Sequence, residues 1–410
     1  MNITPDSKAY TILLAGIAAL PPLCIDMNLP AIPSIESAFG VAPGRGALTF
    51  SLFLLGFSLS PIIGGPLADR YGRKPTLTVS LLAATLAAFA CMLDGSFHFL
   101  LASRLVQGIA AGVCILIPLA IIRDTLSGAE ARSRLSGIML IVGVAPLLAP
   151  VIGGSVLAVS GWRAIYGIQG GLGAVLLFFV ATGVSETLPQ DRRRPFNMNQ
   201  LVSGYKSILT DRNFLSLALP IAFGFGCMFS YIAGSPGFLV GKMHLSEQTY
   251  SIVFAGTSFG LMLGSMVSRI MSRWEIHPRP IISAGLALMI ATAGTILLLI
   301  WKGEPSLLVL LPLLLLNMLC FGMMQPNAMS EAVNPWQKMA GTASGAVNSL
   351  QMLVGAGASA LVTALAGIID PGLTMGIAMF CSVVLAGVLY WGLRPGSREL
   401  RFEQNENSAS

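Results

Sequence analysis

The stretch GGPLADRYGRKP, residues 64–75, lies between two apolar segments of the chain. Each of these segments, 47–66 and 76–94, has the length that a membrane-spanning helix needs, about 20 residues. The glycines of the stretch permit a tight turn and a close approach of helix ends. Its basic residues favour the cytoplasmic face of a membrane. The stretch therefore predicts two membrane-spanning helices joined by a short charged turn.

The same apolar pattern extends along the whole chain. Of its 410 residues, 54% are hydrophobic and only 10% are charged, whereas globular proteins carry about 25% charged residues. This composition predicts an all-α membrane protein that crosses the bilayer many times. The apolar segments predict twelve spans, at residues 9–32, 47–66, 76–94, 97–121, 136–158, 164–184, 214–238, 248–270, 280–301, 306–329, 341–367 and 372–393.

Basic residues indicate which ends of the spans face the cytoplasm. With a cytoplasmic amino terminus, the opposite side holds only Arg45, Arg163, Lys242 and Lys302, and nearly all other basic residues fall in cytoplasmic segments. This bias is typical of membrane proteins and predicts that both termini are cytoplasmic. The net charge of +6 therefore indicates topology and gives no reason to expect nucleic-acid binding.

A polar stretch, ETLPQDRRRPFNMNQLVSGYKSILTDRN, interrupts the spans at residues 186–213. It predicts a cytoplasmic linker between an N-terminal six-helix bundle at 1–185 and a C-terminal six-helix bundle at 214–394. A polar cytoplasmic tail follows at 395–410. A weak internal repeat, IIRDTLSGAEARSRLSGIML and AMSEAVNPWQKMAGTASGAV, supports two similar halves. Two such halves indicate a transporter with a site between them.

Two charged residues lie inside apolar segments: Asp26, after AALPPLCI, and Arg104, within FLLASRLVQGIAAG. Such a charge near the bilayer centre costs roughly 3 kcal/mol, and chains that keep one commonly use it for ions, protons or substrates. Asp26 is the candidate proton-coupling carboxyl; the alternative is a helix-end residue at the outer surface, because Pro30 and Pro33 follow. Arg104 cannot itself exchange a proton, so we interpret it as the second residue of the proton-coupling site, which organises a polar network with Gln107, holds a water or shifts Asp26 electrostatically. The alternative is an arginine that snorkels to one interface.

Four motifs resemble those of a known family. GGPLADRYGRKP resembles the loop 2–3 signature of the major facilitator superfamily. RLVQGIAAG (104–112) and GVAPLLAPVIGG (143–154) resemble the fourth-helix and fifth-helix motifs of its proton-coupled antiporters. CIDMNLPAIPSI (24–35) is similar to the first helix of the Bcr/CflA drug-resistance branch. The resemblance covers essentially the whole chain, although the second half has only a degenerate loop signature at 264–280. It implies two six-helix bundles around a central cavity, and drug:proton antiport.

The resemblance also implies two gating elements. In the first, Asp124 joins the charges of the loop 2–3 signature in an inner gate that holds the halves together when the protein faces outward. Solvated loop charges are the alternative, because exposed ion pairs contribute only about 0–1 kcal/mol. In the second, the fifth-helix motif forms a bent, closely packed seal, although Ala145 and Ala149 replace its usual glycines. The candidate gating residues are Gly65, Asp69, Arg70, Gly72, Arg73, Asp124, Pro146, Pro150, Gly153 and Gly154.

Aromatic and Met-rich stretches in the second half are candidates for the wall of the cavity. Flat rings and adaptable thioethers suit varied amphiphilic ligands, although ordinary packing is the alternative for each residue. Amides within spans are further candidates, since an uncompensated amide is costly in lipid. The candidate substrate-binding residues are Asn28, Gln107, Phe223, Met228, Tyr231, Phe254, Met324, Asn327, Asn348 and Gln351.

These observations lead us to expect a proton-coupled efflux antiporter that exports amphiphilic drugs across the bacterial inner membrane. We expect it to act as a monomer in the lipid bilayer, with a small-molecule substrate, protons as the coupling ion and no cofactor or metal. A dedicated exporter of a sugar, amino acid or nucleoside is the alternative, and a non-transporting sensor is a further one. Metal-ligand spacings, nucleophile–base sets and phosphate loops are absent from the sequence, which argues against an enzyme.

Overall fold

The computed structural model describes residues 7–42, 44–93, 95–193, 198–303, 305–365 and 368–393, and the described secondary structure is helical throughout. The predicted tail at 395–410 lies outside the described residues. The helices are α1 (Lys8–Asp26), α2 (Ile32–Phe39), α3 (Leu48–Tyr71), α4 (Arg73–Met92), α5 (Phe97–Thr125), α6 (Gly128–Gly183), α7 (Met198–Leu209), α8 (Arg212–Ser235), α9 (Glu247–Arg273), α10 (Pro278–Lys302), α11 (Leu307–Val333), α12 (Ala340–Leu365) and α13 (Pro371–Leu393). Short helical turns are η1 (Leu29–Ala31), η2 (Arg45–Ala47), η3 (Gln190–Arg192), η4 (Pro236–Lys242) and η5 (Asn334–Met339).

Eleven helices of the described part of the chain are long and apolar enough to cross a membrane. The longest, α6, comprises two spans, because the backbone at Gly161 leaves the helical conformation (φ 74°, ψ 175°). Counting α6 as two spans gives twelve. The break falls between the spans predicted at 136–158 and 164–184, and the predicted fold class is confirmed.

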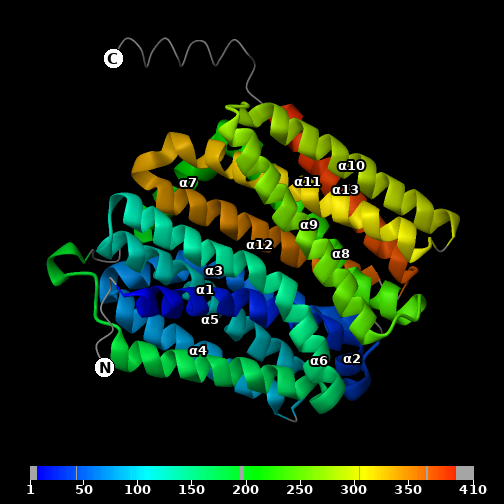
Figure 1. Ribbon diagram of the computed structural model, residues 1–410, viewed down its shortest axis with the longest axis horizontal. Coiled ribbons are helices and arrows are strands. Elements are labelled where there is room, and N and C mark those ends of the chain that lie inside the picture. Colours follow the sequence, from blue (N-terminus) through cyan, green and yellow to red (C-terminus); the bar gives the residue numbers. More distant parts are fainter. Residues whose placement is uncertain are drawn as a thin grey trace.

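The helices form two groups that repeat one packing pattern (Figure 1). In the first group, α3 packs on α5, and α4 packs on both α5 and α6. In the second group, α9 packs on α11, and α10 packs on both α11 and α13. The two groups meet where α3 packs on α12 and where α6 packs on α9. The weak sequence repeat therefore corresponds to a repeated arrangement of helices.

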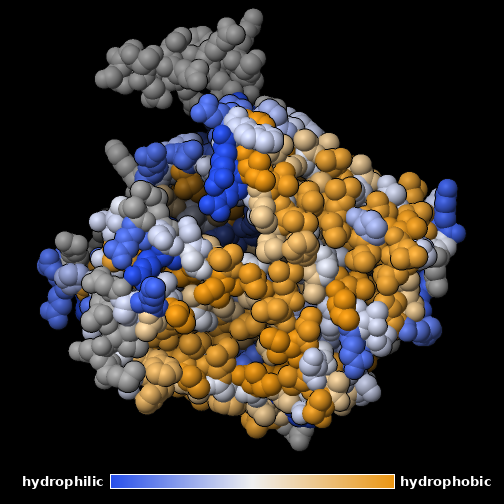
Figure 2. All heavy atoms as spheres, in the orientation of Figure 1, coloured by the Kyte–Doolittle hydropathy of each residue, from blue (hydrophilic) through white to orange (hydrophobic). Residues whose placement is uncertain are grey.

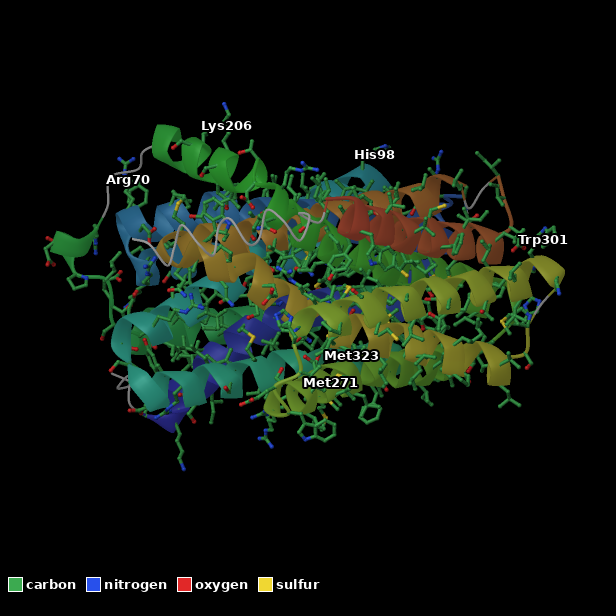
Figure 3. The ribbon with its side chains drawn as sticks, turned by 90° about the horizontal axis from the view of Figure 1, so that it is seen from above. Arg70, His98, Lys206, Met271, Trp301 and Met323 are labelled. Carbon is green, nitrogen blue, oxygen red and sulfur yellow. The ribbon has the colours of Figure 1, made fainter. Side chains whose placement is uncertain are left out.

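The two ends of the molecule are formed by different elements. Arg70, in the last turn of α3, and Lys206, in α7, lie toward one end, and Trp301 lies at the other (Figure 3). We call the first the linker end, because α7 belongs to the polar stretch at 186–213. This helix packs against α8 and α12. The polar stretch was expected to be a connector, and a helix within it was not predicted.

The surface between the two ends is largely apolar. Figure 2 shows a broad hydrophobic band on the face in view, with hydrophilic residues gathered toward the two ends. Side chains such as Ile12, Val79 and Leu308 are exposed. A contiguous apolar surface of this extent would be unfavourable in water and is the surface that a bilayer solvates.

Candidate transport site

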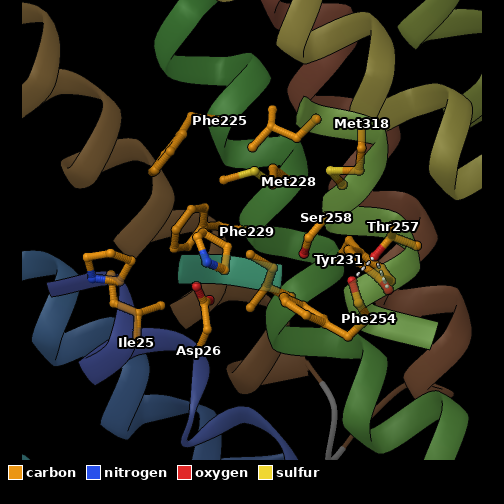
Figure 4. A pocket seen from close by; sticks show the side chains of 14 residues that line it. Ile25, Asp26, Phe225, Met228, Phe229, Tyr231, Phe254, Thr257, Ser258 and Met318 are labelled. Atoms are coloured by element: carbon orange, nitrogen blue, oxygen red, sulfur yellow. Dashed lines mark hydrogen bonds between the residues drawn. The ribbon is translucent and has the colours of Figure 1, made fainter. Parts of the chain in front are cut away.

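A cavity of about 200 Å³ lies between the two halves (Figure 4). Helices α1 and α6 supply its wall from the first half, and α8, α9 and α11 supply the wall from the second. Pro146, predicted as a gating residue, contributes to this wall. The lining residues are Pro22, Ile25, Asp26, Pro146, Phe225, Met228, Phe229, Tyr231, Ile232, Phe254, Thr257, Ser258, Leu261 and Met318.

Asp26 brings a carboxyl group into this cavity. It is the last residue of α1, because the chain turns at Met27 and Asn28 into η1. The residue is only 5% exposed, and its carboxyl group forms no hydrogen bond or ion pair with the residues that the structure describes. Figure 4 shows the carboxyl group on the side of the cavity where Phe229 lies. Burial of a carboxylate without a partner costs free energy. Binding of a proton, a cation or a hydrogen-bond donor would therefore stabilise this group.

Stacked aromatic rings form one wall of the cavity. The rings of Phe225 and Phe229 lie 4.2 Å apart between centroids, and Phe229 also stacks at 5.1 Å on Phe50 of the first half. The side chains of Met228 and Met318 lie on the same side of the cavity as Phe225 (Figure 4). Rings and thioethers give an apolar surface that adapts to the shape of a ligand.

Hydroxyl groups of the second half provide the other polar atoms of the cavity. Tyr231 Oη and Thr257 Oγ1 are hydrogen-bonded at 3.1 Å, and the Tyr231 ring stacks on Phe254 with centroids 6.0 Å apart. Ser258 Oγ has no hydrogen-bond partner among the described residues. This hydroxyl group is therefore free to bind a ligand.

Arg104 lies in the interior of the first half and is only 1% exposed. Its Nε donates to Thr49 O at 3.2 Å, its Nη2 donates to Cys24 O at 3.1 Å, and its Nη1 donates to Gln107 Oε1 at 2.5 Å. The guanidinium group thus joins α1, α3 and α5, and no ion pair links it to Asp26 within the described part of the chain. Its burial rules out snorkelling to an interface. Arg104 reaches Asp26 only indirectly, through the α1 backbone at Cys24.

The predicted substrate-binding residues divide into two groups. Met228, Tyr231 and Phe254 line the cavity. Asn28 instead donates from Nδ2 to Cys24 O, and Asn327 donates to Met323 O and Ser268 Oγ. The predicted residues that do not contribute to this cavity are Asn28, Gln107, Phe223, Met324, Asn327, Asn348 and Gln351. The candidate list omitted Pro22, Ile25, Phe225, Phe229, Ile232, Thr257, Ser258, Leu261 and Met318.

The charges of the stretch at 64–75 form ion pairs at the linker end. Arg73 Nη1 lies 2.6 Å from Asp69 Oδ1, and Arg73 Nε lies 2.9 Å from Asp124 Oδ2. Arg70 instead lies over the Tyr71 ring, with its Cζ 5.1 Å from the centroid. These pairs connect α3, α4 and α5 within the first half. The predicted link between the halves in an outward-facing state stays a prediction.

Glu186, the first residue of the polar stretch at 186–213, caps the amino terminus of α4. Its Oε1 accepts from Arg73 N at 3.0 Å, and its Oε2 accepts from Lys74 N at 3.2 Å. Gly72 precedes α4 with φ 107°, and a Cβ atom at this position would overlap Glu186 Oε2. Glycine therefore allows both the turn and the approach of the carboxylate. Sequence reasoning did not identify Glu186; its position at the start of the linker was the available signal.

Removal of this cap has a measurable expected cost. We expect Glu186→Ala to lower the free energy of unfolding by about 0.5–2 kcal/mol, the range for lost helix caps. The measurement is thermal unfolding of the purified protein in detergent. Glu130→Ala is the matched control, since Glu130 pairs with Arg134 at 3.3 Å on an exposed surface, where a pair contributes little. Equal melting of the two variants would show that Glu186 does not stabilise α4.

Small residues of the fifth-helix motif allow close packing of α6. A Cβ atom on Gly153 would overlap the Met27 carbonyl oxygen, and one on Gly154 would lie 2.5 Å from Ser251 Oγ. The first contact is with the end of α1, and the second crosses to α9 in the other half. A Cβ atom on Gly65, by contrast, would meet nothing within 4 Å.

Hydrogen bonds join the two halves at the end opposite to the linker. Ser51 Oγ donates to Ser359 Oγ at 2.7 Å, and Ser34 Oγ donates to Glu247 Oε1 at 3.3 Å. Toward the linker end, the surface is hollowed between the first part of α6 and the last part of α9 (Figures 1 and 2). On the face in view, the first part of α6 and the last part of α9 are therefore separated toward the linker end.

Two repeated halves, an apolar outer surface and a buried carboxyl group in a cavity between the halves define a membrane transporter. The chain belongs to the Major Facilitator Superfamily, whose model matches residues 14–360. This finding confirms the resemblance that the motifs showed.

Several curated relatives match nearly the full chain. The "Uncharacterized MFS-type transporter YdgK" of Bacillus subtilis (strain 168) is 30% identical over 95% of this chain and 96% of its own length. The "Multidrug resistance protein MdtL" of Klebsiella pneumoniae (strain 342) is 29% identical over 90% and 92%. The "Bicyclomycin resistance protein homolog" of Haemophilus influenzae is 26% identical over 98% and 99%.

Solved structures share the fold at low sequence identity. A bacterial homolog of the human lysosomal transporter Spinster, in an inward-facing and occupied conformation, matches with a TM-score of 0.74 and 18% identity over 96% of this chain and 97% of that one. A D-xylose-proton symporter matches with a TM-score of 0.71 and 14% identity over 95% and 98%.

Proposed function

We propose that this protein is a proton-coupled antiporter that exports amphiphilic drugs and related small molecules across the bacterial inner membrane. It acts as a monomer with both termini in the cytoplasm. The observation that carries the proposal is the Asp26 carboxyl group, which is buried, lacks a partner among the described residues and faces a cavity between the two halves. The relatives named for multidrug resistance and bicyclomycin resistance support a drug as the substrate.

The composition of the cavity supports an amphiphile over a polar metabolite. Phe225, Phe229 and Met228 offer apolar surface to the body of a ligand. The polar side chains of the lining are few: one carboxyl group and the hydroxyl groups of the second half. A sugar or nucleoside has many hydroxyl groups that each need a partner when buried, and this lining does not supply them. The alternative of a dedicated metabolite exporter is therefore less favoured.

Substrate export is coupled to proton import because the Asp26 carboxyl group binds the substrate and a proton in turn. When Asp26 is ionised, a cationic or hydrogen-bond-donating part of the substrate neutralises it in the cavity. When the cavity opens to the outside, a proton replaces the substrate on Asp26. The protonated protein then returns and releases the proton to the cytoplasm as the next substrate binds. One proton moves inward for each substrate moved outward at this site, and rocking of the halves exposes the site to each side in turn.

A panel of compounds in everted membrane vesicles tests this function. Ethidium, tetraphenylphosphonium and chloramphenicol represent amphiphiles, and xylose and uridine represent polar metabolites. We expect an imposed pH gradient to drive transport of several amphiphiles, which compete with one another, and a protonophore to stop it. Saturable transport of a single polar metabolite, with no competition by the amphiphiles, would instead support the dedicated exporter.

A further inference from the structure

Three side chains form a hydrogen-bonded series through the interior of the first half. Gln169, on the second part of α6, accepts at Oε1 from Gln107 Nε2 of α5 at 3.2 Å. Gln107 Oε1 in turn accepts from Arg104 Nη1. Gln169 is only 2% exposed, and Gln107 is fully buried. The series therefore connects α6 to the guanidinium group of Arg104, and sequence reasoning did not identify Gln169.

The guanidinium group approaches the end of α1 that carries Asp26, without forming an ion pair there within the described residues. Its Nη2 donates to Cys24 O, which lies two residues before Asp26, or about 3 Å of helix rise. Its Cζ lies 4.4 Å from the centroid of the Phe53 ring, inside the first half. The Asp26 carboxyl group instead faces the cavity toward Phe229 of the second half (Figure 4). The cation and the carboxyl group thus lie at the same end of α1 but face different ways.

Arg104 is the charged group whose position bears most on Asp26. On the second half, the titratable groups that face Asp26 are the phenol groups of Tyr231 and Tyr250, and tyrosine is uncharged at neutral pH. The other charged residues of α5, α6, α8 and α9 lie toward the ends of the membrane spans. The electrostatic environment of the carboxyl group therefore depends on where the Arg104 side chain is held.

An ion pair between Arg104 and Asp26 would impair the proposed coupling. A guanidinium group beside a carboxyl group favours the ionised carboxylate and lowers its affinity for a proton about tenfold to a thousandfold. Arginine keeps its positive charge throughout, so the pair would also compete with a cationic substrate for the carboxylate. Exchange of a proton for a substrate at Asp26 is therefore favoured while Arg104 is held elsewhere.

We propose that Gln169 is a positioning residue, which holds Arg104 away from Asp26 by fixing the Gln107 side chain. Without Gln169, Gln107 Nε2 keeps its weak contact with Cys24 Sγ at 3.5 Å. The amide of Gln107 then turns more freely and no longer fixes the guanidinium group. The released N–H groups donate to the Asp26 carboxylate instead. This role rests on the proposed function, in which Asp26 binds the coupling proton.

The amide of Gln169 contributes little to stability. Its Nε2 is buried and has no hydrogen-bond partner among the described residues. The cost of an unpartnered buried donor is at least comparable with the net gain from one hydrogen bond, such as that at Oε1. Gln169→Leu removes both the bond and the unpartnered donor. We therefore expect this variant to fold and to melt near the temperature of the unchanged protein.

Infrared titration of the Asp26 carboxyl group tests the positioning role without a substrate. The C=O band of protonated Asp26 is identified in the purified protein by its loss in Asp26→Asn, and its intensity is followed against pH. We expect the midpoint for Gln169→Leu to lie at least about one pH unit below that of the unchanged protein, a tenfold loss of proton affinity. The direction follows because an ion pair with Arg104 favours the ionised form.

Asn317→Leu is the matched control, because Asn317 is a buried amide of the second half that is not part of the cavity lining. Its Nδ2 donates to Met289 O at 3.2 Å and to Thr292 Oγ1 at 2.8 Å. We expect Asn317→Leu to lower the melting temperature and to leave the midpoint unchanged. Gln169→Asn is a second test, since it keeps an amide but is one methylene too short to reach Gln107. We expect it to lower the midpoint as well.

The possible outcomes separate this inference from the proposed function. A midpoint that is unchanged or higher in Gln169→Leu and Gln169→Asn would overturn the positioning role and leave proton binding at Asp26 intact. An equal shift of the midpoint in Asn317→Leu would also overturn it, because loss of any buried amide would then have the same effect. If Asp26→Asn removes no titrating band, proton binding at Asp26 is refuted, and the positioning role with it.

Discussion

Replacement of Asp26 by asparagine is expected to reduce pH-gradient-driven efflux to the rate of vesicles that lack the protein. Asparagine keeps the size of the side chain but cannot bind and release a proton at physiological pH. The carboxyl group has no hydrogen-bond partner to lose among the described residues, so the variant should fold and reach the membrane. Downhill exchange of substrate should persist, because that process needs no net proton movement. The measurement is paired efflux and exchange in everted vesicles.

Asp370→Asn is the matched control for this substitution. Burial raises the pKa of Asp370, but the hydrogen bond from Lys242, with Nζ at 2.6 Å from Oδ2, outweighs this effect and holds the pKa below its ordinary value. This carboxyl group therefore remains ionised at neutral pH, which makes it a suitable control for Asp26. We expect Asp370→Asn to retain driven efflux and Asp26→Glu to restore part of it. An Asp26→Asn variant with the rate and pH dependence of the unchanged protein would refute the assignment of the proton to Asp26.

Replacement of Arg104 by alanine is expected to prevent stable folding. The change leaves the buried Gln107 Oε1 without its donor and removes the hydrogen bonds that tie Thr49 O of α3 and Cys24 O of α1 to α5, although Cys24 O keeps the bond from Asn28 Nδ2. Each buried polar group left unsatisfied costs about 1–3 kcal/mol, and the total stability of a protein is only about 5–15 kcal/mol. We expect a low yield of monodisperse protein in detergent and a strongly lowered melting temperature.

Two further variants separate a structural role of Arg104 from an electrostatic one. Arg123→Ala removes the same charge from the exposed end of α5 and should leave melting nearly unchanged. Arg104→Lys keeps the charge, but one ammonium group cannot reach acceptors on α1, α3 and α5 as the guanidinium fork does. We therefore expect intermediate melting for Arg104→Lys. Full recovery by lysine would show that charge alone matters at this position.

The fold could be predicted from the sequence because each membrane span requires a long apolar segment. This requirement located the twelve spans, including the break at Gly161 inside α6. It also isolated Asp26 and Arg104, since a charge within such a segment is conspicuous. The motif at 64–75 identified the family, and the matching family model confirms this.

The residues that line the cavity were harder to predict from the sequence, because the sequence does not show which face of a span meets which neighbour. Asn28 and Asn327 were candidates for substrate binding, yet each donates to a carbonyl four residues earlier in the chain. Ser258 was overlooked, although its hydroxyl group is unpartnered among the described residues. Glu186 was missed for a related reason, since its partners at the start of α4 lie more than 100 residues earlier. Contacts over such distances depend on the assembled fold.

Proton release on substrate binding most directly tests the claim that Asp26 exchanges the coupling proton for the substrate. The purified protein, in weakly buffered detergent solution with a pH indicator, is mixed with the best substrate of the vesicle panel at a pH where Asp26 is protonated. We expect the unchanged protein to release protons as it binds substrate, and Asp26→Asn to bind substrate without releasing any. Equal proton release from Asp26→Asn would contradict the account, because another group would then exchange the proton.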